Sequence, residues 1–303
     1  MTDSSLRVKI ITAFASVYLI WGSTYLAIRF VIETMPPFLM AGFRFLLAGG
    51  ILLLFEKFRS KEPEKITKDH IRSGFIVGGL LLLGGNGGVV WAEQFVPSGL
   101  TALLISTVPI WIVVFTMFTG SKSKPDKLTV IGVVTGFAGL LYLVYNTTGF
   151  SADSINPFGV LALIFATISW AYGSVITSRL SFPKAKLTAV ALQMLGGGVL
   201  LTLFSLITGD AFLFNPETVS LKSFLSLIYL ILFGSLIGYT AYIWLLEKAG
   251  PPKTATYAYV NPVVAIFLGW LLADEVISFE ILTGAAIILV SVAMIISVKA
   301  RKA

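Results

Sequence analysis

Residues 223–246 read SFLSLIYLILFGSLIGYTAYIWLL, and this stretch decides the fold because it contains no Asp, Glu, Lys or Arg. A helix of about 20 apolar residues spans the hydrocarbon core of a bilayer, which is roughly 30 Å thick. Only helices and closed barrels satisfy their backbone polar groups in lipid, and the stretch lacks the alternation of a barrel strand. The sequence therefore predicts a transmembrane helix here.

The same apolar pattern recurs along the whole chain. The runs of sufficient length are 10–31, 37–55, 73–92, 98–119, 128–146, 158–178, 187–208, 223–246, 254–273 and 280–298. The first run is too long for the apolar region of a signal peptide, and no small-residue cleavage pattern follows it, so we expect it to stay in the mature protein. The connections are short. We therefore predict an all-α integral membrane protein with ten transmembrane helices.

Composition supports a membrane protein. Of the 303 residues, 56% are hydrophobic and only 12% are charged, with a mean hydropathy of +0.91. A soluble domain has about 25% charged residues, so an ordinary soluble enzyme is excluded. The chain has no cysteine and a single histidine, His70, which we expect in a solvated loop within the charged stretch 57–72. No thiolate or histidine cluster can form, and we expect no metal and no cofactor.

The distribution of positive charge predicts the orientation. The net charge is +7, and 19 of the 22 Lys and Arg residues fall on the side that carries both termini. Only Lys222 lies in the opposite loops, while Arg29 and Arg44 lie inside spans. We expect the protein in the plasma membrane, and the positive-inside rule then predicts that both termini lie in the cytoplasm. The basic excess is a topology signal, and we expect no binding of nucleic acid.

The two halves of the chain resemble each other. The coinciding pairs are Trp21 with Trp170 and Arg44 with Gln193 at a shift of 149, and Gly85 with Gly238 and Pro109 with Pro262 at a shift of 153. Each half holds five spans, an odd number, so the second half would enter the membrane from the opposite face. We predict two inverted five-helix repeats, residues 1–149 and 150–303. Inverted repeats recur in secondary transporters, whose substrate sites lie near the bilayer midplane between them.

Three motifs carry a family resemblance. They are Trp21-Gly22-Ser23-Thr24-Tyr25 in the first span, Pro36-Pro37 followed by Arg44-Phe45 in the second, and Asn261-Pro262 in the ninth. With these motifs the chain resembles the drug/metabolite transporter superfamily, in its EamA-like permease branch, over essentially its whole length. The resemblance implies a ten-helix permease for small metabolites, often an exporter, and leaves the substrate open.

Polar and aromatic residues at mid-depth define a predicted substrate pathway, because such groups should face the bundle interior or a water-filled cavity. Counting about 1.5 Å per residue from the border selects Trp21, Ser23, Tyr25, Asn86, Ser106, Pro109, Trp170, Tyr172, Tyr239, Tyr242, Tyr257, Asn261 and Pro262. Alternatives stay open. The tryptophans could serve packing alone, Asn86 could bond a facing helix, and the two prolines could kink their helices without lining a cavity.

Charged residues near the membrane borders form a second set of candidates, namely Arg29, Glu33, Arg44, Glu93 and Glu247. One interpretation is a gate whose ion pairs break when the cavity opens, and the other is an exposed salt-bridge cluster with snorkelling side chains. We expect the three glutamates to stay hydrated at the borders, so that burial does not raise the pKa of any of them strongly.

The absence of a carboxylate at mid-depth disfavours proton coupling through a central acid, so the sequence predicts a uniport or a solute exchanger. An aromatic and hydroxyl-rich pocket without fixed charge would suit small neutral, zwitterionic or amphipathic solutes, such as amino acids, aromatic metabolites or drugs. A phosphorylated substrate would need central Lys or Arg, which we do not expect. We predict a non-enzymatic permease, an exporter that works by alternating access. A flippase for a lipid-linked metabolite and a non-transporting membrane sensor or assembly protein are the alternatives.

Overall fold

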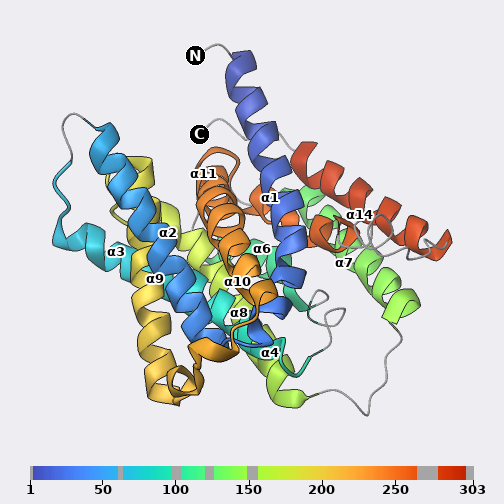
Figure 1. The fold of residues 1–303 in the computed structure, drawn as a ribbon. Coiled ribbons are helices and arrows are strands. Elements are labelled where there is room, and N and C mark those ends of the chain that lie inside the picture. The colour runs from blue at the N-terminus through green and yellow to red at the C-terminus, as the bar shows by residue number, and fades with distance from the viewer. Residues whose placement is uncertain are drawn as a thin grey trace.

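The computed structural model describes residues 3–60, 64–96, 101, 104–119, 126–148, 156–264 and 279–297, and every regular element in them is helical (Figure 1). The helical segments long and apolar enough to cross a membrane are Ser5–Ile32, Pro37–Arg59, Lys68–Ala92, Pro157–Arg179, Lys186–Thr208 and Leu221–Lys248. Shorter apolar helices are Val108–Phe118, Lys127–Tyr142 and Leu282–Ser297. The prediction of an all-helical membrane-spanning chain is confirmed for the described residues.

The first half begins with two long helices. Its elements are α1 (Asp3–Ile32), α2 (Pro37–Arg59), α3 (Lys68–Gly78), the π-helix η1 (Gly79–Gly87), α4 (Gly88–Ala92), α6 (Val108–Phe118) and α7 (Lys127–Thr148). Pro37 starts α2, where the missing N–H of proline costs no helical hydrogen bond. α3 starts at a capping box in which the His70 N–H donates to Thr67 Oγ1 at 3.3 Å. Since His70 is only 9% exposed, its expected place in a solvated loop is wrong.

The second half repeats this order of long and interrupted helices. Its elements are α8 (Pro157–Ile176), η3 (Thr177–Arg179), α9 (Lys186–Thr208), η4 (Asp210–Leu213), η5 (Pro216–Thr218), α10 (Leu221–Tyr229), the π-helix η6 (Leu230–Tyr239), α11 (Thr240–Lys248), α12 (Pro251–Thr254), an unlabelled helical stretch at 257–264, and α14 (Phe279–Ser297). Asn156 caps α8, and Gly209, with φ 81°, ends α9 in the left-handed conformation that glycine adopts without strain. The predicted boundary at 149/150 and residues 265–273 of the ninth predicted span lie outside the described residues.

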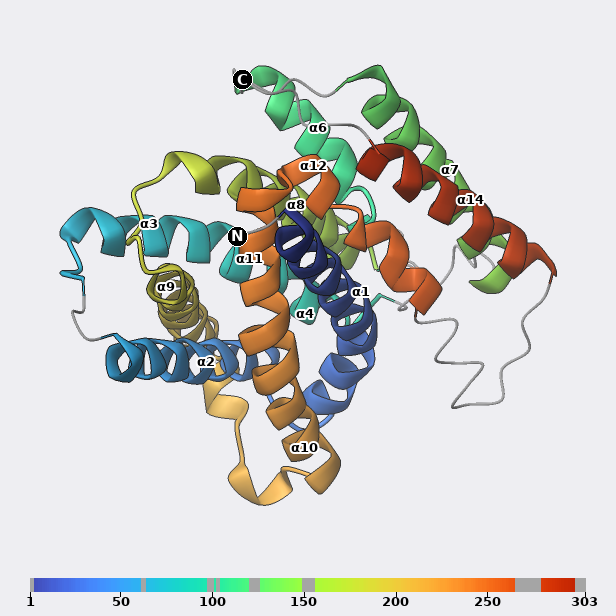
Figure 2. The same cartoon turned by 90° about the horizontal axis from the view of Figure 1, so that it is seen from above.

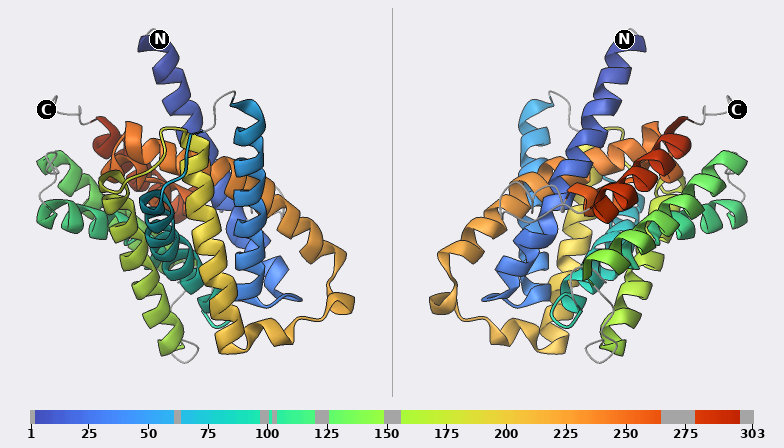
Figure 3. Two further views of the ribbon diagram at one scale, coloured as in Figure 1. Left: turned by 90° about the vertical axis from the view of Figure 1, so that its left-hand side faces the viewer. Right: turned by 90° about the vertical axis from the view of Figure 1, so that its right-hand side faces the viewer.

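Corresponding helices of the two halves pack together. α2 lies along α9, and α7 lies along α14. These two pairs form opposite sides of the molecule, with α1, α8 and α11 between them (Figures 2 and 3). α1 packs against α10, η6 and α11, while α8 packs against η1 and α4. The first helix of each half therefore crosses the interrupted helix of the other half, and the start of α1 and the end of α14 lie toward the same end of the molecule (Figure 3).

The two π-helices lie at matching places and bring the halves into close contact. π-helical segments inside α-helices frequently mark functional sites. A Cβ placed on Gly85 of η1 would lie 2.7 Å from Trp170 Cε3, and one on Gly238 of η6 would lie 2.5 Å from Trp21 Nε1. Each glycine therefore makes room for the tryptophan of the opposite half.

Pro109 and Pro262 lie at different places in their helices. Residues 106–107 form a turn, and α6 begins at Val108, so Pro109 stands in its first helical turn rather than inside a long helix. Pro262 lies within the helical stretch 257–264, where its ring removes one backbone donor. Both prolines are buried.

Candidate functional site

A cavity lies where the two halves meet, and most of its wall comes from α1, α2, η1, α8 and η6. The predicted pathway residues that line it are Trp21, Tyr25, Asn86, Trp170, Tyr239, Tyr257 and Asn261. We call this space the central cavity. Seven residues predicted from their depth in the membrane, from both halves of the chain, therefore line the central cavity.

Aromatic rings form one wall of the central cavity. The Trp21 ring meets those of Trp170 and Tyr257 edge to face, with centroids 5.6 and 4.9 Å apart, and lies 5.0 Å from that of Tyr242. Trp21 Nε1 donates to the Gly234 carbonyl at 3.1 Å. Edge-to-face contacts at these distances are favourable beyond the burial of area, so the rings form a fixed wall.

Two tyrosines separate the central cavity from the end of the molecule where α1 starts, and we call Tyr239 and Tyr242 the tyrosine layer. The Tyr239 hydroxyl donates to Gln193 Oε1 at 3.0 Å. Trp170 Nε1 donates to the Tyr242 hydroxyl at 2.8 Å, and that hydroxyl also bonds Ser174 at 2.6 Å. Both tyrosines are completely buried, so the layer closes the cavity on this side.

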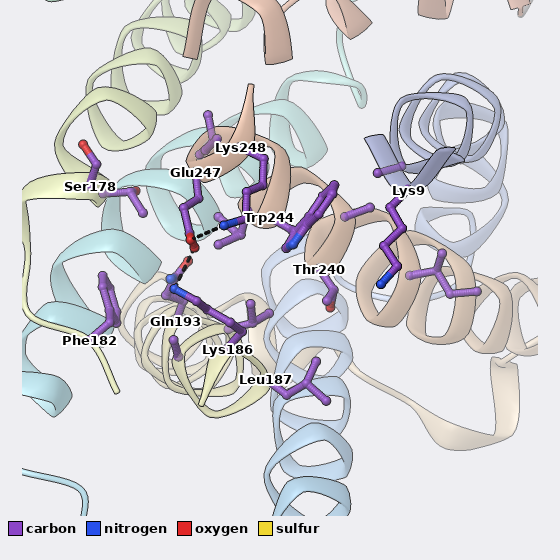
Figure 4. Close-up of a pocket in the computed structure, with 18 of the residues that line it drawn as sticks. Lys9, Ser178, Phe182, Lys186, Leu187, Gln193, Thr240, Trp244, Glu247 and Lys248 are labelled. Atoms are coloured by element: carbon purple, nitrogen blue, oxygen red, sulfur yellow. Dashed lines mark hydrogen bonds and ion pairs between the residues drawn. The ribbon is translucent and has the colours of Figure 1, made fainter. Parts of the chain in front are cut away.

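A wide opening, which we call the vestibule, is lined in large part by residues of α1, α9, η6 and α11 (Figure 4). Gln193 and Ser174, which bond the tyrosines, belong to its lining. Its charged lining residues are Lys9, Lys184, Lys186, Glu247 and Lys248. Glu247 pairs with Lys186 at 2.7 Å and with Lys248 at 3.0 Å, as Figure 4 shows. The described lining is therefore basic, and it leads toward the central cavity.

Other predicted pathway residues lie outside the lining of the central cavity. Ser23 bonds the Tyr229 hydroxyl at 2.6 Å. Tyr172 is 40% exposed, and its ring meets Phe115 at 5.4 Å on the outer surface of α8. Ser106 is buried before α6. Pro109, Tyr242 and Pro262 are also buried and are not among the described lining residues.

Arg44 lies in the interior of the molecule rather than at the membrane border where it was expected. It lines the central cavity and is 4% exposed. Its Nε donates to Ser235 Oγ at 2.8 Å, and the guanidinium carbon lies 4.8 Å from the centroid of the Phe45 ring. The expectation of a cavity without fixed charge is therefore wrong. The physical reason is that the helix α2 packs against η6, so the long side chain of Arg44 reaches the interior.

The other charged candidates lie near the helix ends. Glu33 pairs with Lys222 at 2.6 Å, and Lys222 lies 4.3 Å from the centroid of the Phe30 ring. Arg29 is exposed on α1. Among the described residues neither Arg29 nor Arg44 forms a salt bridge with Glu33 or Glu93, and Glu33 pairs with Lys222 instead.

Glu93 differs from the candidates Glu33 and Glu247, which are partly exposed, because its carboxylate is buried. It follows directly on the membrane span that ends at Ala92. Both of its carboxylate oxygens are buried and have no hydrogen-bond partner among the described residues. Burial raises the pKa of Glu93 to about 8, although the positive charge of Arg29 opposes the shift. The expectation that Glu93 stays hydrated is therefore wrong.

The raised pKa of Glu93 predicts a pH-dependent effect of Glu93→Gln on stability. A carboxyl group whose folded pKa lies above its unfolded value destabilises the fold as pH rises from the unfolded pKa to the folded one. At about pH 9 the variant should therefore melt at a higher temperature than the parent protein, by roughly 2–4 °C for each kcal/mol recovered. At about pH 4 the two proteins should melt at a similar temperature. Thermal unfolding in detergent at both pH values measures this, and Glu33→Gln is the control. Equal shifts at the two pH values would contradict the prediction.

Comparison with known proteins gives one family. The model of the EamA-like transporter family matches residues 8–145 and 157–297. An Escherichia coli K12 relative, "Uncharacterized inner membrane transporter YedA", is 41% identical over 267 residues, which cover 88% of this chain and 83% of the relative. The Bacillus subtilis "Uncharacterized transporter YoaV" is 31% identical over 286 residues, which cover 93% of this chain and 94% of the relative.

A solved crystal structure has the same fold. It superposes on this chain with a TM-score of 0.74 and covers 94% of this chain and 95% of its own. The two sequences are 18% identical, so the likeness concerns the fold alone.

Proposed function

Since this chain belongs to the EamA-like transporter family and is a multi-pass membrane transporter, we propose that it is a ten-helix permease that exports small metabolites by alternating access. Its two halves are proposed to be inverted repeats, residues 1–149 and 150–303. The reciprocal packing of α1 on η6 and of α8 on η1 supports this arrangement. The protein lies in the plasma membrane, with both termini in the cytoplasm.

The observation that carries the proposal is the central cavity between the halves, closed off from a wide vestibule by two buried tyrosines. A transporter with inverted repeats needs a site near the midplane and a barrier on each side of it. The tyrosine layer is the proposed inner barrier, because breaking its bonds to Gln193 and Ser174 would join the two spaces. Substrate would enter from the vestibule and contact the aromatic wall.

Charged residues at the borders are the proposed gates. The pairs of Glu247 with Lys186 and Lys248 lie in the lining of the vestibule, and the pair of Glu33 with Lys222 joins the turn after α1 to the start of α10. Exposed ion pairs are worth about 0–1 kcal/mol each, so they can break and reform during transport. Arg29 and Glu93 lie at the same end of α1 as Glu33.

A metabolite-export screen followed by flux in proteoliposomes tests the proposal. Cells that overproduce the chain should release a metabolite that control cells retain, and the purified chain should carry that metabolite across liposomes. A flippase would instead move a lipid-linked metabolite between leaflets, and a sensor or assembly protein would give no flux of any kind.

Labelling of single cysteines tests the proposed orientation, since the chain contains no cysteine. Because 19 of the 22 Lys and Arg residues lie on one side, we expect that side to be cytoplasmic. In intact cells an impermeant maleimide should label Ser151→Cys and should spare Ser60→Cys until the cells are opened. The reverse pattern would overturn the orientation and the assignment of the vestibule to the cytoplasm.

A further inference from the structure

The guanidinium of Arg44 is held in place but is not neutralised. Ser235 accepts from Nε, while Nη1 is buried and has no hydrogen-bond partner in the described part of the chain. Nη2 lies over Gly234, where an added Cβ would stand 2.8 Å from it. No Asp or Glu pairs with Arg44 among the described residues. An arginine stays protonated in proteins, and a buried unpaired cation is strongly destabilising. Binding of an anion beside Arg44 would therefore offset the free-energy cost of this unpaired buried charge.

A second polar group lines the same cavity without a partner. Asn86 Oδ1, from η1, is buried and accepts no hydrogen bond from any of the described residues. Buried polar atoms are normally satisfied, and two such groups facing one cavity point to a ligand that satisfies them. The remaining wall is aromatic, with Trp21, Trp170 and Tyr257. The cavity thus offers a donor that carries charge, an acceptor and an apolar surface.

The charge of the vestibule agrees with the charge of Arg44. Four lysines and one glutamate are among its described lining residues. A basic opening attracts anions and raises their local concentration at a site behind it. The same sign of charge thus extends from the mouth of the vestibule to Arg44 in the central cavity.

From this arrangement we propose that Arg44 binds the carboxylate of a small organic acid, which is the substrate of the permease. Arg44 Nη1 donates to the carboxylate, Asn86 Oδ1 accepts from a polar hydrogen elsewhere on the substrate, and the apolar part packs against the two tryptophans. This inference rests on the proposed function and narrows its range of solutes. It makes Arg44 a substrate-binding residue, in place of the gating role that its depth in α2 suggested.

Three probes that share one phenyl ring test the proposal. They are 3-phenylpropionate, which has only a carboxylate, L-phenylalanine, which adds an ammonium group, and 2-phenylethylamine, which lacks the carboxylate. Binding to the purified full-length chain in nanodiscs is measured at millimolar concentrations by ligand-induced thermal stabilisation and by calorimetry. Both acids should bind and the amine should not. Tighter binding of phenylalanine would identify an amino acid, and tighter binding of phenylpropionate a simple acid, and each of these supports the proposal.

Arg44→Gln is the decisive variant. It should weaken binding of both acids by roughly 10- to 100-fold, the effect of one charged hydrogen bond. It should also melt no lower than the parent protein, because it removes an unpaired buried charge; a purely structural arginine would give a lower melting temperature. Arg72→Gln, at an exposed position of α3, is the matched control and should change neither quantity. Arg44→Lys should recover only part of the binding, since an ammonium group cannot offer the planar fork of the guanidinium.

Four results would overturn the inference. They are equal binding of the amine and the acids, unchanged binding of the acids by Arg44→Gln, a lower melting temperature of Arg44→Gln, and no binding of either acid. If the export screen then yields flux of a metabolite without a carboxylate, only this inference fails and the proposed permease stands. If no metabolite moves through the purified chain, both fail.

Discussion

Replacing Trp21 with alanine is expected to abolish transport and to lower the free energy of unfolding by about 3–5 kcal/mol. The Trp21 ring is 9% exposed, contacts the rings of Trp170 and Tyr257, and donates to the Gly234 carbonyl. Alanine would remove the wall of the central cavity and leave that carbonyl without its donor. Flux in proteoliposomes, normalised to the amount of folded protein, and thermal unfolding measure the two effects.

The control for Trp21→Ala is Trp91→Ala. Trp91 is partly buried against Phe95 at a centroid distance of 5.1 Å and is not among the described lining residues of the central cavity. The Trp91→Ala variant should be less stable than the parent protein but should keep its flux per folded molecule. Trp170→Ala should lose flux as fully as Trp21→Ala with a smaller loss of stability, because Trp170 is only partly buried. If all three variants kept the same flux per folded molecule, the tryptophans would serve packing alone.

Depth in the membrane was predictable from the sequence, and it located much of the central cavity. A polar or aromatic residue in the middle of an apolar run has few ways to avoid lipid other than to face the interior. Trp21, Asn86, Trp170, Tyr257 and Asn261 all follow this rule. The internal repeat supported the prediction. Because Trp21 and Trp170 occupy equivalent positions in the two halves, both were expected to face one central space.

The face of the helix on which each residue lies was not predictable in the same way. Tyr172 lies two residues after Trp170, which turns it by about 200° to the opposite face of α8. In a soluble helix the polar face would show this difference, but in a membrane helix the lipid face and the buried face are both apolar. Depth alone therefore included Tyr172, which packs on Phe115 outside the cavity.

For two charged residues near the membrane borders, the sequence did not predict where the charged end of the side chain lies. A long side chain covers several ångströms, so the position of its Cα does not decide whether the charge reaches water. Arg44 reaches the central cavity, and the carboxylate of Glu93 is buried beside the end of α4. The alignment of Arg44 with Gln193 was the available signal, because Gln193 bonds Tyr239 in the cavity wall.

The close approach of the two halves predicts that Gly85→Ala and Gly238→Ala lose most of their transport. Each new methyl group would lie within 2.7 Å of a tryptophan atom, so the Trp170 or Trp21 ring must move, at a cost of about 1–3 kcal/mol in stability. Gly50→Ala is the matched control, because a Cβ there meets nothing within 4 Å. In helix α2 it should stabilise by roughly 0.5–1 kcal/mol with unchanged flux. Proteoliposome flux and thermal unfolding of the three variants measure this, and a loss in only one of the two π-helix variants would contradict equivalent halves.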